Sequence, residues 1–217
     1  MTNTVKTHVR NALVAILAIA VLATGILAAH NLSEAIEVER YTKQFYEARV
    51  ETVNQFMQDK MKHFRGPKNY DPEEIKVSPH EIVTAVDEYG YDLVFLLTQA
   101  WCETRMCTTP RAKKTNSMFA VGLHDDGTNA RKYESPDASI RPYIELMQDK
   151  YGITPEKITD IFNGRAMLVN GRGERYATNT DYERSLGTMY RQIKKKYPML
   201  SMTFEEFVEE KEQKREP

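Results

Sequence analysis

One stretch of the chain, residues 91–107, constrains the fold more than any other. Its apolar side chains recur at helical spacing, and Asp92 after Gly90 is a candidate N-cap, so we predict a buried helix here. Glu103 lies near the end of this helix, beside Trp101. Burying an ionised carboxylate is costly, so such a position raises the pKa and favours the protonated acid. Glu103 is therefore either a proton donor or an acid that faces water where the helix emerges.

The composition limits the classes of protein to consider. The chain has 217 residues, of which 41% are hydrophobic and 28% charged, which is enough for one core with extensions. A net charge of -1 argues against binding nucleic acid through bulk positive charge. Cys102 and Cys107 are too few for a disulfide scaffold and lack the partners of a zinc site, so we predict two free thiols, no metal and no cofactor.

Residues 12–29 form an uncharged run that follows a basic N-terminus, residues 1–11. The run is just long enough to span a hydrocarbon core, and the preceding positive charges place the N-terminus in the cytoplasm and the rest of the chain outside. Seven of its 18 residues are alanine, so it is only weakly hydrophobic. We predict a transmembrane signal-anchor. Two alternatives are a signal peptide cleaved after Ala23-Thr-Gly25 and a segment that leaves the membrane uncleaved, as in some phage endolysins.

The remaining chain divides into three parts. Residues 30–77 are predicted to be an amphipathic helical stalk and linker, whose aromatic stripe favours packing on the domain, and residues 199–217 a charged C-terminal helix. Between them, residues 78–198 form the main domain. Helices are predicted at 78–89, at 135–151 with a distortion at Pro142, and at 181–197, and a further short helix begins at residue 154. A basic loop is predicted at 108–115, and a β-hairpin over 117–133 that turns at Asp125-Asp-Gly127.

Four segments in order resemble one family. They are Thr98-Gln-Ala-Trp-Cys-Glu-Thr104, Asn116-Ser-Met-Phe-Ala-Val121, Tyr133-x-Ser135 with Ile140 to Tyr143, and Tyr176-Ala-Thr-Asn-Thr-Asp-Tyr182. They are similar to the A-Q-x-x-x-E-S, N-N-L-F-G-I, Y-x-S…S-I-x-x-Y and Y-A-T-D-P-x-Y segments of the glucosaminidases, glycoside hydrolase family 73. The resemblance covers about 78–197. It departs from the family at Thr104-Arg-Met-Cys107, where the family has S-G-W-G, and at Ala120, where it has glycine.

The resemblance implies roles for particular residues. Glu103 corresponds to the general acid and Tyr176 to an active-site tyrosine, while Asp125, Asp126 or Glu134 takes the place of a second acid. Residues implied in substrate binding are Gln99, Asn116, Phe119, Tyr133, Glu134 and Tyr182. Glycosidic cleavage needs an acid for the leaving oxygen and usually a second carboxylate, so the residues agree with the resemblance. The aspartates are equally suited to being ordinary turn residues.

We therefore predict a mostly α (α+β), lysozyme-like helical domain with a small β-hairpin lobe, preceded by an N-terminal transmembrane helix. The resemblance implies a peptidoglycan hydrolase of the endo-β-N-acetylglucosaminidase type, at the cytoplasmic membrane with its catalytic domain outside or released into the periplasm. The expected partners are peptidoglycan glycan strands and, through residues 12–29, the membrane; no nucleic acid is expected, and no protein partner is indicated. The alternatives are a lytic transglycosylase, or a non-catalytic glycan-binding protein of an envelope or virion.

Overall fold

The computed structural model describes the backbone of residues 3–62, 75–121 and 131–215, with side chains from residue 32 onward. It divides into two compact units, Met1–Phe45 and Tyr46–Pro217, which are described separately. Helix α1 (Asn3–Lys62) contributes to both. The second unit contains every other element, and the predicted domain boundaries stay predictions.

The first unit is helical throughout its described part. Leu32, Ile36 and Val38 are exposed on it, and Arg40 pairs with Glu37 at 2.8 Å. Over the residues whose side chains are described, the structure contains no helix with the length and apolar character that a membrane crossing needs. The side chains of the predicted span, residues 12–29, lie outside that set, and its membrane role stays a prediction.

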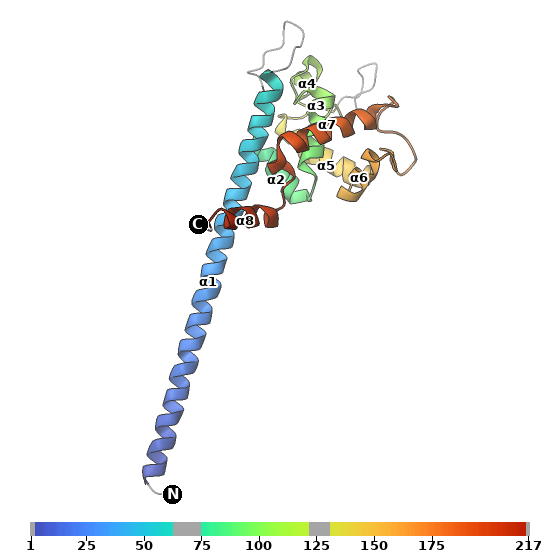
Figure 1. Ribbon diagram of the computed structural model, residues 1–217. Coiled ribbons are helices and arrows are strands. Elements are labelled where there is room, and N and C mark those ends of the chain that lie inside the picture. Colours follow the sequence, from blue (N-terminus) through green and yellow to red (C-terminus); the bar gives the residue numbers. More distant parts are fainter. Residues whose placement is uncertain (1–2, 63–74, 122–130, 216–217) are drawn as a thin grey trace. The chain divides into compact units, whose positions relative to one another are not determined.

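The second unit is built from short helices around α3 (Figure 1). Helix α3 contacts α2 and α7, and α7 also contacts α6. The elements that follow α1 are α2 (Pro79–Tyr89), α3 (Leu93–Thr104), α4 (Pro110–Thr115), the 3-10 turn η2 (Asp137–Ser139), α5 (Ile140–Glu145), the π-helical turn η3 (Leu146–Lys150), α6 (Pro155–Phe162), α7 (Tyr182–Lys196), the 3-10 turn η4 (Pro198–Ser201) and α8 (Phe204–Gln213).

The helix starts follow their capping residues. Asp92 accepts a hydrogen bond from the backbone of Phe95 at 2.7 Å, which confirms it as the N-cap of α3. Ser78 and Thr154 cap α2 and α6 in the same way, each followed by proline at the first helical position. The expected distortion at Pro142 is not found there, because Pro142 lies in the first turn of α5, where proline removes no helical hydrogen bond. The segment is irregular further on, in the π-helical turn that follows α5.

Two expectations of secondary structure need correction. The predicted basic loop at 108–115 contains α4, which Thr109 caps ahead of Pro110 by the same signal that starts α2. The described flanks of the predicted hairpin, 117–121 and 131–133, form no strand, although the Arg131 backbone N–H donates to Val121 O at 3.2 Å. The turn of that hairpin, with Asp125 and Asp126, lies outside the described residues. Within the described part, strand pairing is limited to an isolated bridge between Val169 and Arg175.

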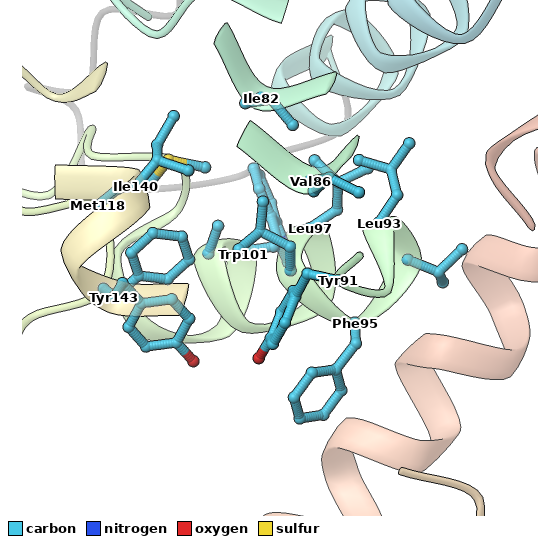
Figure 2. Close-up of a cluster of buried hydrophobic side chains, with 14 of the residues drawn as sticks. Ile82, Val86, Tyr91, Leu93, Phe95, Leu97, Trp101, Met118, Ile140 and Tyr143 are labelled. Atoms are coloured by element: carbon cyan, nitrogen blue, oxygen red, sulfur yellow. The ribbon is translucent and has the colours of Figure 1, made fainter. Parts of the chain in front are cut away.

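The core of this unit lies between α2, α3 and α5. Figure 2 shows Ile82 and Val86 of α2 facing Leu93 and Leu97 of α3, with Ile140 and Tyr143 of α5 close by, and α2, α3 and α5 bury most of these side chains completely. Every residue of α3 from Leu93 to Trp101 is buried, so this helix is the fixed centre of the domain. Its last turn reaches the edge of the core, where Glu103 lies half-buried.

The end of α1, from Tyr46 onward, belongs to the same unit. The Phe56 ring packs edge-on against Tyr197 at 5.7 Å, and the Tyr197 hydroxyl donates to Asp59 at 2.7 Å. Arg49 forms an ion pair with Asp87 of α2 at 2.5 Å. Residues 46–62 therefore pack on the domain, as their aromatic stripe predicts.

Candidate active site

Glu103 lies in the last turn of α3, where the buried helix gives way to a turn. The Tyr182 hydroxyl, from the start of α7, donates a short hydrogen bond to Glu103 Oε1. Burial raises the pKa of Glu103, and the hydrogen bond from Tyr182 opposes that rise because it favours the charged form. The carboxyl group thus lies in surroundings that favour its protonated form, which a proton donor at neutral pH requires.

The turn after α3 has an unusual backbone. Arg105, Met106 and Cys107 have φ of 55°, 59° and 63°, in the left-handed region that residues other than glycine seldom adopt. Thr104 fastens this turn: its hydroxyl donates to Met118 O at 2.5 Å and accepts from the Cys107 backbone at 2.8 Å. The chain therefore leaves α3 abruptly, and Glu103 stays at the rim of the domain.

Tyrosine side chains surround the Glu103 carboxyl group. The rings of Tyr176 and Tyr182 lie 5.6 Å apart, and Tyr151 packs edge-on against Tyr176 at 5.4 Å. Burial, and then the charge of Glu103, raise the pKa of Tyr176 well above its ordinary value; burial, followed by Tyr176 and Glu103, does the same for the pKa of Tyr182. Both phenols therefore remain protonated and can act as hydrogen-bond donors.

A polar group lies behind this pair, inside the core. Gln99 is completely buried one turn before Glu103, and Tyr91 and Tyr143 are also buried. Figure 2 shows the hydroxyl groups of Tyr91 and Tyr143 on the same side of α3. Within the described part, neither these hydroxyls nor the Gln99 amide makes a hydrogen bond, although Gln99 lies close enough to Tyr182 to lower the pKa of its phenol.

The loop before α7 positions Tyr176 and Tyr182. Asn170 closes a tight turn by accepting from the backbones of Arg172 and Glu174, each at 2.9 Å. Glu183, mostly buried, pairs with Arg175 at 2.6 Å and accepts from the Leu168 backbone at 3.3 Å. An ion pair and a backbone contact thus hold the loop against the start of α7, which brings the two tyrosines to Glu103.

Two hollows flank the Glu103–Tyr182 pair. One, of about 270 Å³, is lined by Glu103 and by residues of α4 and the segment after it, including Arg111, Ser117 and Ala120; we call it the Glu103 hollow. The other, of about 300 Å³, is lined by Tyr182 and Arg105 and by residues of α7; we call it the Tyr182 hollow.

The other residues expected at the site are placed as follows. Asn116 has φ of 51° and donates to Tyr133 O and Glu134 O at 3.0 and 3.1 Å, so it fixes the segment that returns from the hairpin region. Phe119 is 1% exposed and stacks on Tyr143 with ring centres 3.7 Å apart. Glu134 is exposed. The structure thus brings Glu103, Tyr176, Tyr182 and Gln99 together, and Phe119 lies in the core beneath them.

Arg105 and Tyr143 are neighbours of the site that sequence reasoning did not single out as functional. Arg105 lines the Tyr182 hollow, and Tyr143 is close enough to Glu103 for the acid's charge to contribute to the rise in its pKa, which burial dominates. The position of Arg105 two residues after Glu103 was the available signal. Both cysteines are free thiols, as expected.

Comparison with known proteins agrees with this geometry. The sequence model of the glucosaminidases, described as mannosyl-glycoprotein endo-β-N-acetylglucosaminidase, matches residues 79–195, which is more than half of the chain and contains Glu103 and both tyrosines. Among curated proteins, none matches the chain. The chain therefore belongs to the glucosaminidase family, and it is a glycoside hydrolase of the kind that cleaves peptidoglycan.

Proposed function

We propose that the enzyme hydrolyses the bond after N-acetylglucosamine in peptidoglycan strands, with Glu103 as its general acid. The observation that carries this proposal is the hydrogen bond from Tyr182 to a carboxyl group whose pKa burial raises. In this mechanism Glu103 protonates the glycosidic oxygen as the bond from that oxygen to the anomeric carbon breaks. Water then adds to the anomeric carbon and gives its proton to a base, for which the candidates are considered below.

Tyr182 and Tyr176 support this step in different ways. Tyr182 holds Glu103 Oε1, so the other carboxyl oxygen is the one that faces the leaving group. In this proposal Tyr176, protonated and packed against Tyr182, stabilises the positively charged sugar through its hydroxyl oxygen. Gln99 lies close to Tyr182, inside the core.

The group that activates water is a separate proposal. The described surroundings of Glu103 that act on its pKa are burial and Tyr182, with no contribution from a second carboxylate. We assign the role to Asp125 or Asp126. The alternative is that the acetamido oxygen of the substrate attacks the anomeric carbon as the glycosidic bond breaks, and that the Glu103 carboxylate then takes the proton of the water that opens this intermediate. Loss of activity in one of Asp125→Asn and Asp126→Asn would identify that aspartate, and full activity in both would favour the acetamido group.

Product analysis tests the reaction type. Cell-wall peptidoglycan digested by the full chain should yield new reducing ends at N-acetylglucosamine. Reducing ends at N-acetylmuramic acid would show that the enzyme cleaves the bond after N-acetylmuramic acid instead. A 1,6-anhydro product would contradict hydrolysis and identify a lytic transglycosylase, the runner-up.

We also propose that residues 12–29 hold the enzyme in the cytoplasmic membrane with its catalytic domain outside. The uncharged run and the basic residues before it support this proposal. Fractionation of expressing cells, with the mass of the mature chain, tests it. Full-length protein in the membrane fraction is expected; a shortened chain would identify a cleaved signal peptide, and full-length soluble protein in the periplasm would identify release.

A further inference from the structure

Arg105 contributes a positive charge to the Tyr182 hollow. It is the residue at the C-cap of α3, two positions after Glu103, and it lines the Tyr182 hollow. The same hollow has an apolar side, with Leu186 and Met189, and a polar side, with Asn179 and Ser185. Arg105 is the charged member of the described lining, which contains no carboxylate.

The guanidinium group is held in position. Arg105 Nη1 donates to Trp101 O at 2.5 Å, and the guanidinium carbon lies 5.4 Å from the centre of the Trp101 ring. Trp101 is itself 6% exposed, so the surface on which the arginine lies is part of the rigid core. An arginine fixed in this way loses little conformational freedom when it binds an anion.

A second cation lies beside Trp101. Lys60 Nζ lies 5.5 Å from the centre of the same Trp101 ring. Burial lowers the pKa of Lys60, and the charges of Lys196 and Arg105 lower it further, whereas Cys102 opposes them. Lys196 is paired with Asp59 at 2.7 Å, so an anion bound near Trp101 would be stabilised mainly by Arg105 and Lys60.

The backbone at Arg105, like that of Met106 and Cys107, is in the left-handed region. Its φ of 55° is a conformation that costs a residue other than glycine about 1–2 kcal/mol. Strained residues of this kind concentrate at functional sites. Glycine would adopt the turn without that cost but would remove the charge from the hollow.

We propose that Arg105 and the Tyr182 hollow form a subsite for a carboxylate-bearing sugar, so that the enzyme prefers acidic glycan strands to neutral ones. This inference rests on the proposed function for its choice of ligand. Two carboxylates of peptidoglycan have the required chemistry: the lactyl carboxylate of muramic acid in strands without peptides, and the carboxylates of the stem peptides. A bidentate bond from the guanidinium suits either one.

Binding measurements separate this inference from catalysis. We would measure the Kd of three ligands for the full chain carrying Glu103→Gln, which keeps the shape of the site. The ligands are peptide-bearing strands, amidase-treated strands with free lactyl carboxylates, and uncharged chito-oligosaccharides. Adding Arg105→Met should weaken binding of at least one acidic ligand about 10- to 100-fold relative to the chito-oligosaccharide, as expected for a hydrogen bond to a charged group.

Two further variants test whether the change in binding is due to the charge of Arg105. Arg105→Gly removes the same charge but adopts the left-handed turn readily, so it should give the same change even if the methionine variant folds poorly. Arg165→Met removes an exposed arginine that lines neither hollow. It should leave the ratio of the Kd of each acidic ligand to the Kd of the chito-oligosaccharide unchanged. The acidic ligand that responds identifies the source of the carboxylate.

Equal losses for acidic and neutral ligands in Arg105→Met and Arg105→Gly would overturn the subsite. So would a ratio that changes as much in Arg165→Met. Failure of the enzyme without these substitutions to cleave any of the three ligands would instead count against the proposed function, and would leave the binding ratio as an independent result.

Discussion

The helices around α3 and the segment from Arg105 to Ala120 follow different rules. In the helices, chain reversals fall on suitable residues: α2 ends at Gly90, which adopts φ of 58° without cost. Among the described residues other than glycine, all five with positive φ lie between Arg105 and Ala120. That segment also supplies most of the Glu103 hollow. Regular packing therefore supports α3, whereas the segment beside the site contains residues in a costly backbone conformation, of which Ala120 lines the Glu103 hollow.

This contrast suggests that the core and the site have been shaped by different requirements. The core gains stability from buried apolar side chains and well-capped helices. The segment beside Glu103 accepts an unfavourable backbone, and its hydrogen bonds to the core hold it there. Substitutions in the two regions should then have opposite consequences for stability and activity.

The largest expected effect is the loss of activity in Glu103→Gln. The amide cannot donate the proton, so turnover should fall by about 10²–10⁴-fold. Release of reducing ends from purified cell wall measures this loss. Activity above about a tenth of the parent's, on the same scale, would place the acid elsewhere.

The same variant should not lose stability at neutral pH. Because burial raises the pKa of Glu103, the favourable contribution of this group is present below its unfolded pKa and is lost as pH rises through the folded pKa. Glu103→Gln should therefore match or exceed the parent in Tm at pH 7, and this advantage should disappear at acidic pH. If the Tm of Glu103→Gln is instead below that of the parent at pH 7, and closer to it at acidic pH, burial does not raise the pKa of Glu103.

Thr104→Val should produce the next largest effect, on stability. The buried Thr104 hydroxyl satisfies Met118 O and the Cys107 N–H, and valine leaves both without that partner. The expected cost is about 2–4 kcal/mol in the free energy of unfolding, measured with denaturant.

Thr98→Val is the matched control for Thr104→Val. Thr98 is also buried on α3, but the partner of its hydroxyl among the described residues is Val94 O, within the same helix. Its replacement should therefore cost about 1 kcal/mol or less. Equal costs at the two positions would remove the distinction between the helix and the turn.

Tyr182→Phe should change the pH dependence more than the maximum rate. Loss of the hydrogen bond raises the pKa of Glu103 further, and a general acid acts in its protonated form. The alkaline limb of the profile of kcat/KM should therefore move to higher pH, with a rate at the optimum within about tenfold of the parent's.

Tyr190→Phe provides the comparison for this profile. Tyr190 lies on the same helix, but its hydroxyl donates to Asp92 at 2.8 Å, at the other end of α3 from Glu103. Its alkaline limb should coincide with that of the parent. A limb that stays in place in Tyr182→Phe, or moves to lower pH, would show that Tyr182 does not set the protonation of Glu103.

The sequence predicts the helical body well because its signals are local. Apolar spacing and the capping residues Asp92, Ser78 and Thr154 give the starts of α3, α2 and α6. Helix α4 was missed although Thr109-Pro110 carries the same signal, because the basic residues that follow suggested a loop.

The site was predictable only in part, because its decisive contacts are not local. Glu103 stands out as an acid on an apolar helix, but its hydrogen bond joins residues 79 positions apart, and no periodicity reports such a pair. The turn at Arg105 to Cys107 contains no glycine or asparagine, so ordinary turn chemistry gives no sign of its positive φ. The sign of positive φ that the sequence did offer is the family pattern, which has glycine in place of Arg105, Cys107 and Ala120.

Ala120→Gly should have the smallest effect on stability, but whether it raises or lowers the free energy of unfolding is the most informative result. Ala120 has φ of 52° and lines the Glu103 hollow, so glycine relieves backbone strain there and removes only a methyl group. After the added flexibility of the unfolded chain is subtracted, a gain of about 0.5–1 kcal/mol in the free energy of unfolding remains. Ala85→Gly, in the interior of α2, should instead cost about 1 kcal/mol, since helical backbone favours alanine. Thermal unfolding of the two variants would measure both, at roughly 2–4 °C for each kcal/mol. If both lower the Tm alike, the left-handed backbone at Ala120 carries no cost, and the contrast between core and site loses its energetic basis.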